Sequence, residues 1–156
     1  MDTQANQNNE QETLLLYKAL INSWNNGNAL DYANLFTAYG NVIGFDGSQM
    51  NGKKQIEDEL NKIFANHKVA TYVYIVREIH SLSSSVYLLR AVAGMIPPGK
   101  TEINPKVNAI QTMIAQKEAD QFRIAIFQNT PAALHERPDL SKQLTEELQE
   151  AYEMQK

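Results

Sequence analysis

Cysteine is absent from the 156-residue chain, which excludes disulfide bonds, thiolate nucleophiles and cysteine-ligated metals. An excess of basic residues is absent as well. The 14 Lys and Arg residues face 18 Asp and Glu residues without a basic cluster, so nucleic acid is not an expected partner. No apolar run approaches the roughly 20 residues that cross a bilayer, and the polar, acidic N-terminus is unlike a signal peptide. We therefore expect a cytoplasmic protein with no membrane partner.

The apolar residues in the first half of the chain recur mainly at helical spacing. Gly27 is expected to end the first helix because it tolerates positive φ, and Asn28 is expected to cap the second. Asp46 and Gly47 form a strong turn pair. The predicted elements are helices at residues 12–26, 28–36 and 53–67, and a short strand with a turn at residues 41–52.

The spacing changes to a period of two after Val69, where β-branched and aromatic residues dominate. The separators are short polar turns and one longer loop, which suit an antiparallel meander. Helical spacing then returns at the C-terminus. The predicted strands cover residues 70–80, 86–95, 105–117 and 122–130. Helices followed by a meander indicate an α+β domain over residues 12–137, with a C-terminal helix at 138–156 and a disordered tail at 1–11.

The last predicted strand also indicates how the protein assembles. Strict alternation puts Ile124 and Ile126 on one face and Ala125 and Phe127 on the other, so both faces are apolar at their centres. A sheet with one face in water should alternate more clearly. Because helices cover one face, we expect a second copy of the chain to cover the other in a homodimer.

Arg90 is the first candidate site residue, because it lies in the middle of an apolar strand where a charge needs a partner or a wet cavity. An ion pair with Glu78 or Glu102 and a ligand-facing role are equally compatible with the sequence. The three histidines lie in unrelated segments without the spacing of metal ligands, so we expect neither a metal site nor a cofactor.

Neutral amides in half-buried strands are the other unusual groups, since each needs a partner from backbone, water or a bound molecule. We predict that Gln128 or Asn129 points into a cavity between sheet and helices. Core packing is the alternative for Trp24 and Tyr32, and a bond to loop backbone is the alternative for Asn129. The predicted ligand-binding residues are Trp24, Tyr32, Arg90, Gln111, Gln128 and Asn129, which suit a small, partly apolar molecule that carries a carbonyl, hydroxyl or carboxylate.

Several motifs resemble the SgcJ/EcaC family of SnoaL-like proteins, within the nuclear transport factor 2-like superfamily and the cystatin-like fold. They are "SWNNGNALDYANLF", "GFDGSQMNGKKQI", "GMIPPG", "NPKVNAIQT" and "FRIAIFQNTPAALHERP", and the similarity covers roughly residues 12–139. It implies a cone-shaped domain whose strongly curved, mainly antiparallel sheet wraps around N-terminal helices, and a homodimer formed through the outer sheet face. The chain departs from the family at Asn28, usually Asp, near Ala38 or Tyr39, usually acidic, and at Phe122, usually Trp. The first two departures argue against a carboxylate at the pocket mouth.

The segments "LDYANLF" and "VYLLRAVAG" are similar to the association domain of calcium/calmodulin-dependent kinase, which shares the fold. This similarity implies that Tyr32 and Arg90 line an inner cavity. No catalytic triad, phosphate-binding loop or pair of catalytic carboxylates is visible. Three classes of function stay open: an isomerase-like or cyclase-like enzyme acting on an oxygenated metabolite, a non-catalytic ligand-binding module, and a structural dimerisation module.

Overall fold

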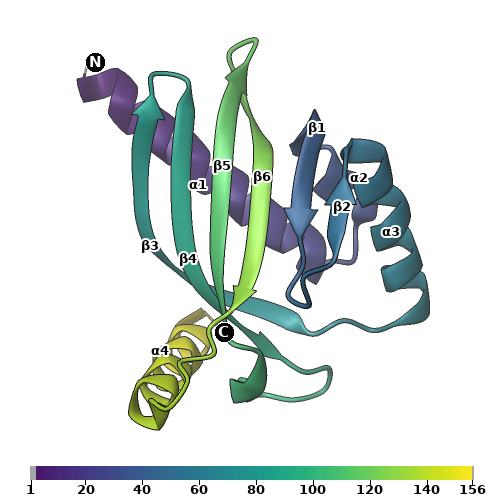
Figure 1. Ribbon diagram of the computed structural model, residues 1–156, viewed down its shortest axis with the longest axis vertical. Helices are drawn as coiled ribbons and strands as arrows, with labels where there is room; N and C mark the ends of the chain where they lie inside the picture. The colour runs from purple at the N-terminus through teal and green to yellow at the C-terminus, as the bar shows by residue number, and fades with distance from the viewer. Residues whose placement is uncertain (1–2, 156) are drawn as a thin grey trace.

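The computed structural model describes residues 3–155 (Figure 1). Helices and strands follow one another in the order that the sequence predicts, with one additional short strand. The elements are α1 (Thr3–Asn25), α2 (Ala29–Ala33), β1 (Phe36–Ile43), β2 (Gln49–Asn51), α3 (Lys53–Asn66), β3 (Thr71–Ser83), β4 (Val86–Ile96), the 3-10 turn η1 (Pro105–Val107), β5 (Ala109–Glu118), β6 (Gln121–Pro131) and α4 (Pro138–Gln155).

One six-stranded sheet organises the domain, in the order β2-β1-β6-β5-β4-β3. Strands β3 to β6 form the predicted antiparallel meander, and β1 joins it by pairing parallel to β6. Helix α1 crosses the inner face of the meander, and α4 lies on the opposite side near the lower end of β3 and β4 (Figure 1). The predicted α+β class, with a mainly antiparallel sheet, N-terminal helices and a C-terminal helix, is confirmed.

The main core lies between α1 and the inner sheet face. Helix α1 contributes Leu16, Tyr17, Leu20 and Ile21, each at most 8% exposed. The Tyr17 ring meets Tyr74 of β3 edge-on, with centroids 5.1 Å apart. Burial of several large apolar side chains of this kind, each contributing roughly 1.5–3 kcal/mol, fixes the helix across the strands.

The predicted link between the first two helices is confirmed. Gly27 follows α1 with a φ of +66°, a conformation in which a side chain would be strained. The Asn28 side chain accepts a hydrogen bond from the Asp31 backbone N–H at 2.9 Å and caps α2. This tight link directs the short helix back across the end of α1.

Two predicted element boundaries are wrong. The second helix ends at Ala33, and Phe36 instead begins β1, where it pairs with Ile124 of β6. The fifth strand begins at Ala109, later than predicted, because Asn104 caps the turn η1 by accepting from the Lys106 backbone N–H. Tertiary pairing and local capping outweigh the spacing pattern at these two places.

The predicted disorder of residues 1–11 is also wrong for residues 3 to 11, which form the first turns of α1; residues 1 and 2 lie outside the described residues. Asn9 is only 8% exposed, and its amide lies 3.5 Å from both the Ser84 carbonyl and the Tyr87 hydroxyl. Asn6 accepts a hydrogen bond from the same hydroxyl. The polar composition that suggested disorder provides contacts to the β3–β4 turn.

The two faces of β6 differ from the strict alternation assumed from sequence. Ile124 pairs with Ala115 but Ile126 pairs with Ile114, so Ala125 is an extra residue and the strand bulges there. Ile124 and Phe127 therefore share the inner face, at 0% and 4% exposed, whereas Ile126 is 39% exposed on the outer face. The outer face is apolar but less so than the sequence suggested.

A second, smaller core lies under α4 on the outer face. Leu144 and Leu148 of α4 pack with Val73, Val92 and Ile96 of β3 and β4. Gly94 permits this close approach, because a Cβ at its position would lie 3.0 Å from a methyl group of Leu148. Helix α4 thus covers only the β3–β4 side, and the outer surface of β5 and β6 carries no helix (Figure 1).

Candidate functional site

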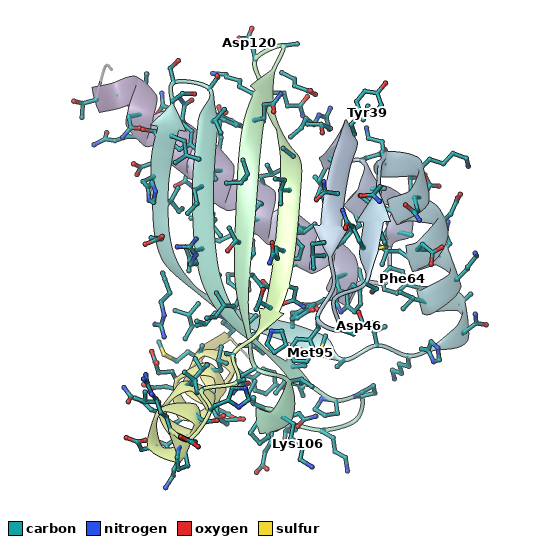
Figure 2. The ribbon with its side chains drawn as sticks, in the orientation of Figure 1. Tyr39, Asp46, Phe64, Met95, Lys106 and Asp120 are labelled. Atoms are coloured by element: carbon teal, nitrogen blue, oxygen red, sulfur yellow. The ribbon has the colours of Figure 1, made fainter. Side chains whose placement is uncertain are left out.

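A cavity of about 510 Å³ lies between α1, α3, the β1–β2 hairpin and one end of the sheet. Asp46 at the hairpin turn and Met95 near the end of β4 both border it, and Tyr39 points outward at the other end of β1 (Figure 2). The volume is in the range of small-molecule sites. Much of the lining is apolar, from Leu20, Ile21, Val42, Leu60, Ile63 and Phe127.

Trp24, the only tryptophan in the chain, forms one wall of the cavity. Its ring contacts Phe64 of α3 and Tyr72 of β3, with centroids 5.3 and 5.5 Å away. The indole N–H donates to the Ala70 carbonyl at 3.1 Å. Because the nitrogen has this partner, Trp24 offers the cavity an apolar ring surface.

A chain of buried hydrogen bonds leads from the core to the cavity. The Tyr17 hydroxyl donates to Gln111 Oε1 at 2.5 Å, and Gln111 Nε2 donates to Asn129 Oδ1 at 3.3 Å. Asn129 Nδ2 then donates to the Tyr72 hydroxyl at 2.9 Å. Gln111 is fully buried, whereas Asn129 and Tyr72 line the cavity. The chain holds the amide and the phenol in fixed positions at the inner end of the site.

The two cavity tyrosines stay protonated at neutral pH. Burial raises the pKa of Tyr72 to about 12, although the hydrogen bond from Asn129 opposes the shift. Burial, reinforced by the proximity of Tyr72, raises the pKa of Tyr32 well above its usual value. Tyr32 is 5% exposed and stacks on Phe36, and its hydroxyl makes no hydrogen bond to any residue within 3–155. Both phenols therefore present neutral hydrogen-bonding groups to the cavity.

Two carboxylates border the mouth of the cavity. Asp46 in the hairpin accepts hydrogen bonds from the Ser48 backbone N–H at 2.9 Å and the Ser48 hydroxyl at 2.6 Å, which lower the pKa of its carboxyl. Glu59 on α3 also lines the cavity, and Lys62 Nζ lies 3.8 Å from it. The mouth is thus polar and acidic, in contrast to the apolar interior.

The structure brings four of the six predicted site residues together. Trp24, Tyr32 and Asn129 line the cavity, and Gln111 lies directly behind Asn129. Asn129 bonds to side chains, so the alternative of a bond to loop backbone does not hold. The core-packing alternative for Tyr32 holds in part, since the ring packs in the core while the residue also lines the cavity.

Arg90 and Gln128 do not line the cavity, whereas the prediction that at least one of Gln128 and Asn129 points into it holds through Asn129. The inward positions of β4 belong to Leu89 and Ala91, so the Arg90 side chain projects from the outer face. There it pairs with Glu78 at 2.9 Å, which is the alternative that the sequence left open. Gln128 is exposed on the same outer face of β6 and donates to the Thr130 hydroxyl at 3.4 Å.

Tyr72 and the mouth residues were not predicted. Tyr72 belongs to an alternating run in which Tyr72, Tyr74 and Val76 pack against the inner core. This alternation could have identified Tyr72 from the sequence, because aromatic residues on the inward face of a strand close to the helices border a cavity between sheet and helices. Asp46 was interpreted as turn chemistry, which its bonds to Ser48 confirm, but the same turn borders the cavity.

Comparison with known proteins identifies the fold. No protein-family model and no curated protein matches the chain. A domain of unknown function with a cystatin-like fold from Nostoc punctiforme aligns with a TM-score of 0.75 and 21% identity over 86% of this chain and 84% of that one. A candidate scytalone dehydratase from Novosphingobium aromaticivorans gives a TM-score of 0.70 and 12% identity over 84% and 89% of the two chains.

A candidate association domain of calcium/calmodulin-dependent protein kinase type II from Thiobacillus denitrificans gives a TM-score of 0.66 and 11% identity, over 74% of this chain and 91% of that one. Other similar structures are described as nuclear transport factor 2-like. The predicted cystatin-like fold is confirmed, and at these identities the similarity concerns the fold alone.

Two further properties concern residues 3–155. No helix in this part of the chain is long and apolar enough to cross a membrane. Within the same residues, no three His, Asp or Glu side chains cluster in a way that could hold a metal ion. The polar side chains that line the cavity are two phenols, three amides, one serine hydroxyl and two carboxylates: Tyr32, Tyr72, Gln49, Gln55, Asn129, Ser48, Asp46 and Glu59.

Proposed function

We propose that the protein is a small-molecule-binding domain whose cavity takes a partly apolar molecule with a hydrogen-bond acceptor, such as a carbonyl or hydroxyl oxygen, at its inner end. The observation that carries this proposal is the hydrogen bond from Asn129 to Tyr72. Because the Tyr72 oxygen accepts this bond, its own proton is available to a ligand. Trp24, Leu60 and Phe127 supply apolar surface for the rest of the molecule.

The Tyr17 hydroxyl determines which groups donate and which accept along the series of buried hydrogen bonds. Tyr17 is fully buried, and Gln111 is the only residue within 3–155 that accepts from its hydroxyl. Reversing the chain would leave the Tyr17 proton without an acceptor, which costs about 1–3 kcal/mol for a buried group. The Gln111 amide therefore presents Nε2 to Asn129, and Asn129 presents Nδ2 to Tyr72. Tyr72 is left as a donor toward the cavity.

The proposal can be tested with 2-decalone, a bicyclic ketone that absorbs only weakly where tryptophan is excited. Trp24 is the single tryptophan and lines the cavity, so its fluorescence reports binding. We expect Tyr72→Phe to weaken 2-decalone binding by about 5- to 10-fold, the value of one hydrogen bond. The matched control is Tyr74→Phe on the same strand, which does not border the cavity and should bind like the wild type. Equal affinities for all three proteins would refute the proposal.

An isomerase-like or cyclase-like enzyme is the second candidate, and the two mouth carboxylates favour it. A base is needed to move a proton during such a reaction, and the inner phenols remain protonated. Asp46 and Glu59 are the only acidic side chains among the described residues that line the cavity. A fold shared with a candidate scytalone dehydratase is compatible with this alternative. Proton exchange at the carbon next to the 2-decalone carbonyl, followed by NMR in D₂O, would support it if Glu59→Gln or Asp46→Asn abolished the exchange.

We also propose membership of the SgcJ/EcaC family and a homodimer through the outer sheet face. The family proposal is supported by the motifs of residues 12–139, within a fold that those motifs correctly predicted. The dimer proposal is supported by Ile110 and Ile126, which are 38% and 39% exposed on β5 and β6 beside the area that α4 covers. A specific dimer would bury roughly 1,000 Å² or more of this face in total.

A further inference from the structure

The charged side chains that line the cavity are all acidic. Asp46 comes from the β1–β2 turn and Glu59 from α3, so two separate elements each contribute a carboxylate. No Lys, Arg or His from residues 3–155 lines the cavity. The family resemblance argued against a carboxylate at the mouth, because Asn28 replaces the usual acid. These two positions provide acidic groups from elsewhere in the chain.

Neither carboxylate is neutralised by a close, ordered cation. Asp46 forms no ion pair with any residue in the described part of the chain; its partners are the N–H and hydroxyl of Ser48, which hold the pKa of its carboxyl below the usual value. The Lys62 ammonium lies 3.8 Å from Glu59, but its side chain is 73% exposed, so this pair is weak. The mouth therefore keeps net negative charge at neutral pH.

A second, independent observation in the same cavity indicates a ligand. Only 5% of Tyr32 is exposed, the residue lines the cavity, and its hydroxyl bonds to no residue within 3–155. A hydroxyl on a cavity wall without a protein partner obtains its hydrogen bond from water or a bound molecule. The cavity thus combines one unpaired phenol inside with two carboxylates at its mouth, of which Glu59 is paired only weakly with Lys62.

We infer that the site selects molecules with a positively charged group, such as an amine, at the end that faces the mouth. This inference rests on the proposed function, in which the apolar body and its acceptor oxygen occupy the interior. The ammonium then lies near Asp46 and Glu59 while the oxygen reaches the Tyr72 hydroxyl. A carboxylate at the same end meets the like charge of Asp46 and Glu59, which the exposed Lys62 offsets only weakly, so carboxylic acids should bind less well.

The size of the preference follows from the exposure of the mouth. Glu59 is 43% exposed and Asp46 is exposed, so each attraction is screened by water and salt. Together they should strengthen amine binding by about 3- to 10-fold over an uncharged analogue. Because the attraction is electrostatic, the difference should shrink as salt increases from about 20 mM to 1 M.

Three para-substituted acetophenones that differ only at the end of a three-carbon chain test this inference by calorimetry at pH 7. One carries a dimethylammonium group, one a hydroxyl and one a carboxylate. The expected order of affinity is ammonium, then hydroxyl, then carboxylate. The Asp46→Asn, Glu59→Gln double variant should bring the ammonium and hydroxyl compounds to within about twofold of each other.

The matched control is Glu57→Gln with Asp58→Asn, which removes two carboxylates of α3 that do not border the cavity and gives the same net charge. It should keep the wild-type order. Equal binding of all three compounds by the wild type, or an equal loss of preference in both double variants, would overturn the inference. Failure of even the hydroxyl compound to bind, together with no binding of 2-decalone, would instead refute the proposed function.

Discussion

Asn129 on β6 donates a hydrogen bond to the hydroxyl of Tyr72 on β3, 2.9 Å away, although 57 residues separate the two in sequence and the sheet order places three strand interfaces between them. The sheet must curve strongly for its first and last meander strands to meet in this way. The curvature of the sheet thus brings Asn129 and Tyr72 together at the cavity, and their hydrogen bond holds both side chains in place there.

Gln111 should be essential to this arrangement. It is fully buried and joins Tyr17 to Asn129. Replacing it with Leu leaves a buried hydroxyl and a buried amide oxygen without their partners, so we expect a loss of about 2–4 kcal/mol of unfolding free energy in urea titrations.

The control for Gln111 is Gln128→Leu, which makes the same substitution on the exposed outer face. That variant should remain within about 0.5 kcal/mol of the wild type. Similar losses from both variants would show that the buried chain contributes nothing particular to stability.

The proposed dimer makes opposite predictions for two neighbouring residues. Ile126 is 39% exposed on the outer face, whereas Phe127 is 4% exposed in the inner core. Ile126→Asp should give a folded monomer in light scattering, while Phe127→Asp should fail to fold, because a buried unpaired carboxylate is very costly. A wild-type mass equal to one chain at about 50 μM would contradict the dimer.

Much of the fold could be predicted from the sequence because it depends on the apolar period. The meander strands and α3 have unambiguous spacing, so their existence was predicted correctly. The helical structure of residues 3 to 11 was not predicted, because it is supported by long-range hydrogen bonds in which Asn9 donates to Ser84 and Asn6 accepts from Tyr87. The local composition of residues 3 to 11 does not reveal hydrogen-bond partners that lie far away in the sequence.

The site was harder to predict, for a reason visible in β6. The bulge at Ala125 moves every later residue of β6 to the opposite face from the one that strict alternation predicts. Gln128 and Asn129 could therefore not be assigned to the correct faces from spacing alone. Arg90 was ambiguous for a different reason: pairing with Glu78 across β3 and β4 depends on strand register, which a single sequence specifies weakly. Trp24 and Tyr32 were identified because the predicted fold brings their segments around one cavity, and the similarity to the kinase association domain implied the same place for Tyr32.

The N-terminal turns of α1 provide a test of that interpretation. Deleting residues 1–11 would cost nothing if they formed a disordered tail. Because Asn9 is buried against the β3–β4 turn, we expect the deletion to lower the unfolding free energy by about 1–3 kcal/mol. Hydrogen exchange should also show protected amides from about residue 7 onward in the full chain. Complete exchange of these amides within seconds would restore the tail hypothesis.

The ion pair that joins α4 to the sheet should give stability a defined dependence on pH. Two hydrogen bonds of 3.0 Å connect the Arg77 guanidinium to Glu147, and they lower the pKa of the Glu147 carboxyl below its ordinary value of 4.5. A carboxyl whose pKa is lower in the folded state stabilises the fold above its unfolded pKa and loses that contribution as pH falls through the folded value. The stabilisation is thus present at pH 7 and disappears in acid. Both side chains are about 40% exposed, so solvent screening limits it to roughly 0.5–1 kcal/mol.

Arg77→Met keeps the apolar stem of the side chain but removes the charge, so it isolates this contribution. We expect the variant to be roughly 0.5–1 kcal/mol less stable than the wild type at pH 7 in urea, and the difference to be smaller at pH 3. Lys54→Met serves as a control, because the pair of Lys54 with Asp58 lies within α3, where its side chain is 89% exposed. This control should change stability by less than about 0.5 kcal/mol at either pH. If Arg77→Met were destabilised by the same amount at pH 7 and pH 3, an effect other than the loss of the ion pair with Glu147 would account for it.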